Sequence, residues 1–140
     1  MIKTKYEFID HTADLGIKVW GKNLPLLFSN SAYALFDIIT DLNNVEEKER
    51  KDIEVKSENL TELFVEWLRE LLYRFEVGEM VFKKFDVHTL TEQKLSSHCF
   101  GEKIDRRRHK LKSEIKTVTY HQLYIKKVKD VWEVQVIFDI

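Results

Sequence analysis

The strongest pattern in the chain is a stripe of apolar residues that recurs every three or four positions between residues 60 and 75. The stripe consists of Leu60, Leu63, Phe64, Trp67, Leu68, Leu71, Leu72 and Phe75. Residues at this spacing lie on one face of an α-helix, so the pattern predicts a long amphipathic helix. Asn59, followed three residues later by Glu62, indicates a capping box at its start, and Gly78 suits a left-handed stop after its end.

A second helix is predicted over residues 24–40. Asn23 is a suitable N-cap, and Pro25 falls in the first turn, where its missing N–H has no cost. The apolar residues that follow have helical spacing; they are Leu27, Phe28, Ala32, Leu35, Phe36 and Ile39. This helix also needs an apolar surface to pack against.

The remaining apolar positions mostly alternate or are rich in β-branched and aromatic residues, which is typical of strands. Strands are predicted at 6–9, 15–19, 52–56, 80–88, 94–100, 114–119, 123–128 and 131–138, with a tight turn at Lys129 and Asp130 between the last two. Helices and mostly antiparallel strands together predict an α+β fold. We expect a two-layer sandwich in which two long helices pack on one face of a mostly antiparallel sheet.

Length and composition place this fold in a single domain spanning 1–140. A chain of 140 residues with 44% hydrophobic and 34% charged residues can bury one core, and its 4 Gly and 1 Pro exclude low-complexity sequence. The single cysteine excludes an intramolecular disulfide, and no run of 18 apolar residues predicts a membrane span. A soluble cytoplasmic protein without a membrane partner is the expectation.

The net charge of −1 conceals an asymmetry. Residues 103–130 carry ten Lys and Arg against three Asp and Glu, a net +7, and the rest of the chain therefore carries −8. Within this basic region, Tyr120 and His121 follow Lys116 closely, and basic residues interleaved with aromatic ones can bind RNA or phosphate. The alternative is a solvated hairpin with charged edge strands, so the region predicts at most a weak or indirect RNA contact.

Acidic residues concentrate at two places. Residues 10–14, Asp-His-Thr-Ala-Asp, connect two predicted strands, and Asp139 and Ile140 directly follow the last one. Such a segment can be a turn that satisfies its own backbone, but its oxygen atoms also suit a hard cation. One short segment supplies too few ligands, so a site requires the last strand to pair beside the first ones.

The sequence lacks several common catalytic motifs. The sequence has no phosphate-cradling Gly-rich loop, no Gly-x-Ser-x-Gly elbow and no His-Glu-x-x-His helix. Cys99 lies in a predicted strand, where a lone cysteine is more often a buried hydrophobe than a nucleophile.

Several segments together resemble the archease family. They are FIDHTADLGI at 8–17, GEK at 101–103, KLKSEIK at 110–116, VTYH at 118–121 and VIFDI at 136–140. The resemblance spans essentially the whole chain. It implies a strand-helix-strand-strand module with added strands, in agreement with the α+β sandwich.

The resemblance also implies a function. Archeases are accessory proteins without a catalytic site of their own that activate the RtcB-type RNA ligase of tRNA splicing. They promote guanylylation of the ligase with GTP and divalent metal, support its multiple turnover and can broaden its nucleotide use. The family's metal ligands correspond to Asp14, Asp139 and Ile140, which favours calcium, with magnesium or manganese as alternatives.

Four more positions match recurrent polar residues of the family: His11, Lys116, Tyr120 and His121. We assign them to a surface that faces the partner or adjoins the metal. Two other functions stay open. The chain could be a metal-dependent hydrolase or nuclease, with His11 or His121 as general base beside an ion held by Asp14 and Asp139. It could also be a chaperone of another RNA-processing enzyme, such as a tRNA methyltransferase.

Overall fold

The computed structural model describes residues 6–9 and 14–140. Its elements are β1 (Tyr6–Ile9), β2 (Leu15–Gly21), α1 (Leu24–Ile39), the 3-10 helix η1 (Leu42–Asn44), β3 (Glu49–Lys56), α2 (Leu60–Glu76), β4 (Met80–Leu90), β5 (Lys94–Lys103), β6 (Thr117–Val128) and β7 (Val131–Asp139).

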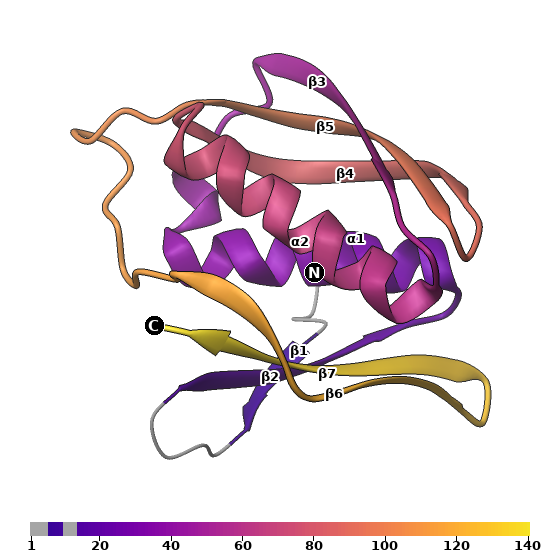
Figure 1. The fold of residues 1–140 in the computed structure, drawn as a ribbon. Coiled ribbons are helices and arrows are strands. Elements are labelled where there is room, and N and C mark those ends of the chain that lie inside the picture. Colours follow the sequence, from indigo (N-terminus) through magenta and orange to yellow (C-terminus); the bar gives the residue numbers. More distant parts are fainter. Residues whose placement is uncertain (1–5, 10–13) are drawn as a thin grey trace.

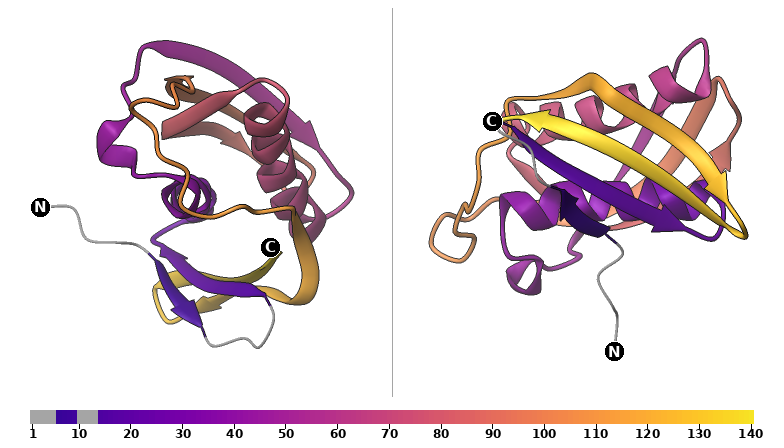
Figure 2. Two further views of the ribbon diagram at one scale, coloured as in Figure 1. Left: turned by 90° about the vertical axis from the view of Figure 1, so that its left-hand side faces the viewer. Right: turned by 90° about the horizontal axis from the view of Figure 1, so that it is seen from below.

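The strands form two antiparallel sheets with the helices between them (Figures 1 and 2). The larger sheet has the order β1-β2-β7-β6, and the smaller one has the order β3-β5-β4. Both helices contact strands of both sheets. The predicted α+β sandwich is confirmed, and the structure adds that its strands are divided between two sheets. An antiparallel sheet buries one face, and here each sheet turns that face toward the helices.

The predicted helices are confirmed nearly to the residue because their end signals are local. The Asn23 and Asn59 side chains accept hydrogen bonds from the N–H groups of Leu26 and Glu62, each at 2.9 Å. The end of α2 differs from the prediction. Gly78 does not have a positive φ, and the left-handed residue is Glu79, with φ 56°. The helix still ends at Glu76, and the left-handed residue follows one position after the glycine.

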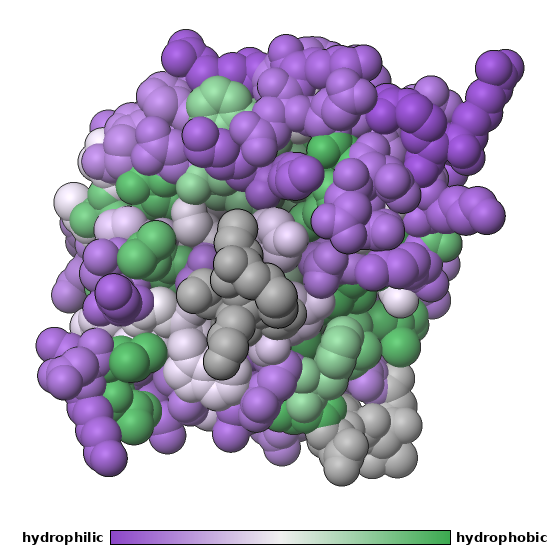
Figure 3. Space-filling model, turned by 180° about the vertical axis from the view of Figure 1, so that it is seen from behind, coloured by the Kyte–Doolittle hydropathy of each residue, from purple (hydrophilic) through white to green (hydrophobic). Residues whose placement is uncertain are grey.

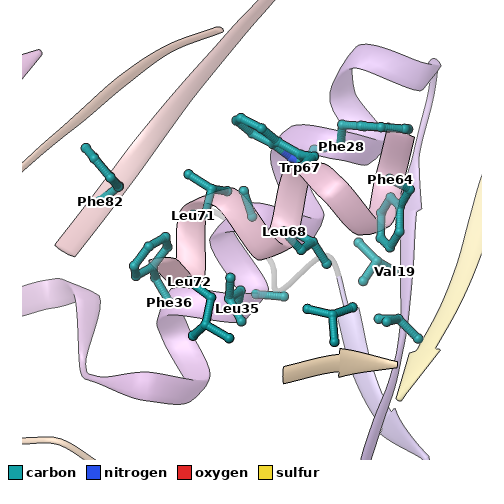
Figure 4. Packing of buried hydrophobic residues seen from close by; sticks show 14 of the residues in the cluster. Val19, Phe28, Leu35, Phe36, Phe64, Trp67, Leu68, Leu71, Leu72 and Phe82 are labelled. Carbon is teal, nitrogen blue, oxygen red and sulfur yellow. The ribbon is translucent and has the colours of Figure 1, made fainter. Parts of the chain in front are cut away.

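The apolar stripe of α2 forms the centre of the core (Figure 4). Trp67 is fully buried, and its Nε1 donates to the carbonyl oxygen of Phe28 at 3.0 Å, so the indole leaves no unsatisfied donor. Phe28 and Phe64 pack edge to face with their ring centroids 5.2 Å apart. These contacts join α1 to α2 and fix the distance between the sheets.

Several strand predictions are wrong in their bounds. β3 begins at Glu49, three residues before the predicted strand, and β4 and β5 continue to Leu90 and Lys103. The separate strands predicted at 114–119 and 123–128 are one strand, β6, which begins only at Thr117 and has an irregularity between Thr119 and Tyr124. The polar residues 120–122 interrupt the hydrophobic pattern, but pairing with β7 resumes after them, so the strand continues.

The outer surface over the three-stranded sheet is dominated by hydrophilic residues (Figure 3). Its edge strand β3 places Arg50 beside Asp52, with Nε and Oδ1 3.2 Å apart, and Glu54 within 3.3 Å of the Nζ of Lys94. Charged side chains on an edge strand discourage pairing with another chain. In the described part of the chain, no helix is long and apolar enough to cross a membrane.

Candidate functional site

The two acidic ends of the sequence meet at one end of the four-stranded sheet. β2 pairs with β7 in antiparallel register, with Leu15 opposite Phe138. Asp14 precedes Leu15 and Asp139 follows Phe138, so the two aspartates occupy neighbouring strand ends, with Ile140 directly beyond. We call Asp14, Asp139 and the main chain of Ile140 the carboxylate pole. The pairing that the sequence analysis required is thus present.

Lys116 also lies at the carboxylate pole. It immediately precedes β6, and its backbone N–H donates to the carbonyl oxygen of Asp139 at 2.7 Å. Its side chain is exposed. A cation beside a group of carboxylates reduces their mutual repulsion and offers a donor to a partner molecule.

Tyr120 and His121 lie farther along β6, in its irregular segment. Both side chains are exposed, and Tyr120 is 48% accessible. The backbone N–H of His121 donates to Oγ1 of Thr119 at 3.3 Å. The structure therefore places Tyr120 and His121 on β6 and Lys116 directly before it, at the end of the strand that lies at the carboxylate pole. His11 and Asp10 lie outside the described residues.

The donors of the carboxylate pole fit a hard cation. Asp14, Asp139 and the main chain of Ile140 all offer oxygen, the ligand that calcium, magnesium and manganese accept. Within residues 6–9 and 14–140, no group of three His, Cys, Asp or Glu side chains is arranged to hold a metal ion. The pole thus provides two side-chain carboxylates and a main-chain oxygen. It supplies only part of the six to eight oxygen ligands typical of calcium.

The basic region 103–130 does not form a single surface. Residues 103–116 connect β5 to β6 on the side of the carboxylate pole, whereas the turn between β6 and β7 lies at the opposite end of the sheet (Figures 1 and 2). Lys129 in that turn and Lys126 and Lys127 at the adjoining end of β6 are all exposed. The basic residues of the connection and those near the turn are close in the sequence because β6 joins them, but the length of this strand separates them in space.

A cluster that sequence reasoning missed holds the start of the 103–116 connection. Glu102 is buried, and its carboxylate accepts bonds from Arg108 Nη2 at 2.6 Å and from the N–H of Glu46 at 2.8 Å. Burial alone would raise the pKa of Glu102, but the bonds from Arg108, Glu46 and His109 outweigh it and lower the pKa to about 2. The family-like segment Gly-Glu-Lys at 101–103 was the feature of the sequence that could have pointed to this cluster.

His109 completes this cluster, which we call the Glu102 clasp. Its Nδ1 accepts from the N–H of Asp105 at 2.8 Å, so the ring proton resides on Nε2. That Nε2 lies 3.0 Å from both Glu102 Oε2 and the Asn44 carbonyl oxygen, and it donates to them. The clasp ties the 103–116 connection to η1. The Glu102 clasp therefore gives a structural role to part of the family-like sequence in this region.

A groove of about 560 Å³ lies between the end of α2 and the 103–116 connection. Phe75, Ile104 and Leu111 contribute apolar lining, and Glu76 and Glu79 contribute carboxylates. None of the predicted site residues lines it. The described site residues therefore lie outside this groove, at one end of the four-stranded sheet.

Cys99 is confirmed as a buried residue, and we expect it to be chemically inert. Burial raises the pKa of its thiol to about 12, so almost no thiolate forms at neutral pH. A thiol reagent at neutral pH should leave the folded protein unmodified and should label it fully in denaturant, as measured by intact mass. Stoichiometric labelling of the folded protein would contradict this prediction.

The chain is similar to proteins of a known family. Residues 6–140 match the model of the Archease protein family. Protein archease of Methanosarcina barkeri is 41% identical over 97% of this chain and 96% of its own, and that of Pyrococcus abyssi is 39% identical over 97% and 99%.

Two solved structures are also similar. The solution structure of Methanobacterium thermoautotrophicum Protein 1598 matches with a TM-score of 0.85 and 33% identity, covering 99% of this chain and 100% of its own. A Thermotoga maritima archease, described as a possible chaperone, matches with a TM-score of 0.56 and 21% identity over 94% of both chains. At that identity, the second likeness concerns the fold alone.

Proposed function

The chain belongs to the archease family, and from this premise we propose that it is an accessory protein that activates an RtcB-type RNA ligase. In this proposal the ligase performs the covalent chemistry. The archease promotes guanylylation of the ligase and its multiple turnover in tRNA splicing. It acts in the cytoplasm through an acidic, metal-binding strand end.

The observation that carries the proposal is the carboxylate pole. Asp14 and Asp139 come from opposite ends of the chain and meet through the pairing of β2 with β7. Placing carboxylates side by side costs electrostatic energy, which a bound cation offsets. An exposed strand end can also enter the active site of a larger partner, which a residue lining an internal pocket cannot do.

We propose that Asp14, Asp139 and the main-chain oxygen of Ile140 hold a divalent cation, with calcium as the favoured ion and magnesium and manganese as alternatives that accept the same oxygen donors. A divalent cation near GTP would supply charge stabilisation for the phosphates during nucleotidyl transfer. The residues of this chain orient the donors. The 2.7 Å bond from Lys116 N–H to the Asp139 carbonyl oxygen ties the pole to β6.

The surface next to the pole supplies contacts to the partner in this proposal. Lys116 lies at the pole directly before β6, Tyr120 and His121 lie farther along this strand, and the Arg-rich connection 103–116 lies on the same side of the molecule as the pole (Figure 1). His11, which is outside the described residues, is assigned to this surface by the family resemblance alone. Lys126, Lys127 and Lys129 are at the far end, so any RNA contact there would be separate from the pole.

The direct test is multiple-turnover RNA ligation by the ligase of the same organism with GTP, with and without this protein. We expect stimulation that increases with divalent metal up to saturation of the pole. A role by binding alone, such as the chaperone role printed for the Thermotoga maritima protein, predicts stimulation independent of that metal. No stimulation would reject the proposal, and RNA cleavage by the purified protein alone would favour the nuclease.

A further inference from the structure

Arg69 on α2 reaches the strand that carries the predicted partner-facing residues. Its Nε and Nη2 both donate to the carbonyl oxygen of Val118, at 3.3 and 2.9 Å. β6 is the last strand in the order of the four-stranded sheet, so its outer side faces α2 and not another strand. The guanidinium thus anchors the edge strand to the helix just before its irregular segment begins.

The irregular segment interrupts the pairing of β6 with β7 over several residues. Thr119 pairs with Ile137 and Tyr124 with Gln135, so the four residues 120–123 lie opposite Val136 alone. Gln122 has a φ of 52°, a conformation that costs energy for a residue with a side chain. Such a segment keeps one shape only if the surrounding contacts hold it.

Contacts from both sides hold this segment. On the sheet side, Nε2 of Gln135 donates to the Gln122 carbonyl oxygen at 3.0 Å. On the helix side, the Arg69 guanidinium lies over the ring of Tyr120, 5.4 Å from its centroid. One face of the ring is therefore occupied, while 48% of Tyr120 is accessible.

The chemistry of this contact requires arginine. A planar guanidinium can chelate one carbonyl oxygen with two N–H groups and at the same time cover an aromatic ring, whereas a lysine ammonium is a compact point charge that cannot do both. Glu66 is the nearest acid, with its Oε1 3.9 Å from Arg69 Nη1. That exposed pair adds little energy by comparison.

We propose that Arg69 is a positioning residue: it fixes the irregular segment of β6 so that Tyr120 and His121 present one rigid surface to the partner. This rests on the proposed function for its biological readout. It adds a residue outside the family-like motifs. The partner group that Tyr120 meets would be planar or cationic, because the exposed ring face favours such groups.

The test compares Arg69→Lys, which keeps the charge, with Glu66→Gln, which removes only the weak neighbouring pair. We expect Arg69→Lys to raise the concentration needed for half-maximal ligase stimulation about tenfold, with the maximal rate unchanged, because the partner surface must then be ordered on binding. In the Tyr120→Ala background, Arg69→Lys should add little, since both act through one surface. Glu66→Gln should match the wild type.

A second measurement is independent of the ligase. In the NMR spectrum of the free protein, Arg69→Lys should shift or broaden the amide signals of residues 120–123 and leave those of the β7 core unchanged. An unchanged half-maximal concentration in a ligase that the wild type stimulates, or unchanged signals at 120–123, would overturn the positioning role. If the wild type fails to stimulate at all, the proposed function fails, and the NMR result still decides the role of Arg69.

Discussion

Asp14→Asn is expected to remove stimulation of the RNA ligase at limiting divalent metal while leaving the fold intact. The substitution keeps the shape of the side chain and removes one of the negative charges of the carboxylate pole. Since charge count tunes the affinity of oxygen-ligand sites, we expect cation binding to weaken tenfold or more, at least about 1.4 kcal/mol. Calcium titration by calorimetry and multiple-turnover ligation would measure the two effects separately.

Asp130→Asn provides the matched control. Asp130 is an exposed aspartate in the turn between β6 and β7, at the opposite end of the sheet from the pole. Asp130→Asn removes one negative charge, as Asp14→Asn does, so it controls for the change in net charge. Equal loss of stimulation in both variants, or full stimulation by Asp14→Asn at limiting metal, would show that the pole does not hold the functional cation.

Arg108→Ala is expected to have the largest effect on stability. Its Nη2 donates to Glu102 Oε1 at 2.6 Å, and Glu102 is only 3% exposed. Removing Arg108 takes away the ion-pair partner 2.6 Å from a buried carboxylate, which keeps His109 and the Nζ of Lys48, 3.8 Å away. We expect a measurable loss in the free energy of unfolding at neutral pH, smaller than for a fully buried pair because Arg108 itself is partly exposed. Urea unfolding measures this change.

The pH dependence identifies the cause. The folded pKa of Glu102, about 2, lies below its ordinary value, so the clasp stabilises the fold above that ordinary value and loses this contribution as the pH falls toward 2. The difference between wild type and Arg108→Ala should therefore shrink on acidification. Arg107→Ala, an exposed arginine in the same turn, should stay within about 0.5 kcal/mol of the wild type. A difference that is constant with pH would argue for lost packing instead of lost charge pairing.

The sequence predicted those parts of the fold that depend on neighbours in the chain. The apolar stripe of α2 and the caps Asn23 and Asn59 are patterns of a few residues, and they placed both helices correctly. The turn at Lys129 was also predictable, and Lys129 indeed has a φ of 59°. The bounds of the strands were predicted less accurately, because in the sequence an irregular segment such as 120–123 looks like the end of a strand.

The candidate site divides in the same way. The residue types and the family-like motifs pointed to Asp14, Asp139 and Ile140, but only the register of Leu15 with Phe138 brings the two aspartates to neighbouring strand ends. Arg69 gave no signal in the sequence, because an arginine on a helix surface is ordinary. Its significance comes from the Val118 carbonyl and the Tyr120 ring on a distant strand.

The sequence by itself thus determined the helices, the α+β class and the chemical types of the candidate ligands, since local spacing and side-chain chemistry are legible one segment at a time. The tertiary structure decided that the strands form two sheets around the helices, that the basic region is split between two ends, and that Arg108 and His109 both bind the buried carboxylate of Glu102. These depend on which distant segments pair, and pairing is set by burying the helix faces and satisfying backbone hydrogen bonds across the whole fold.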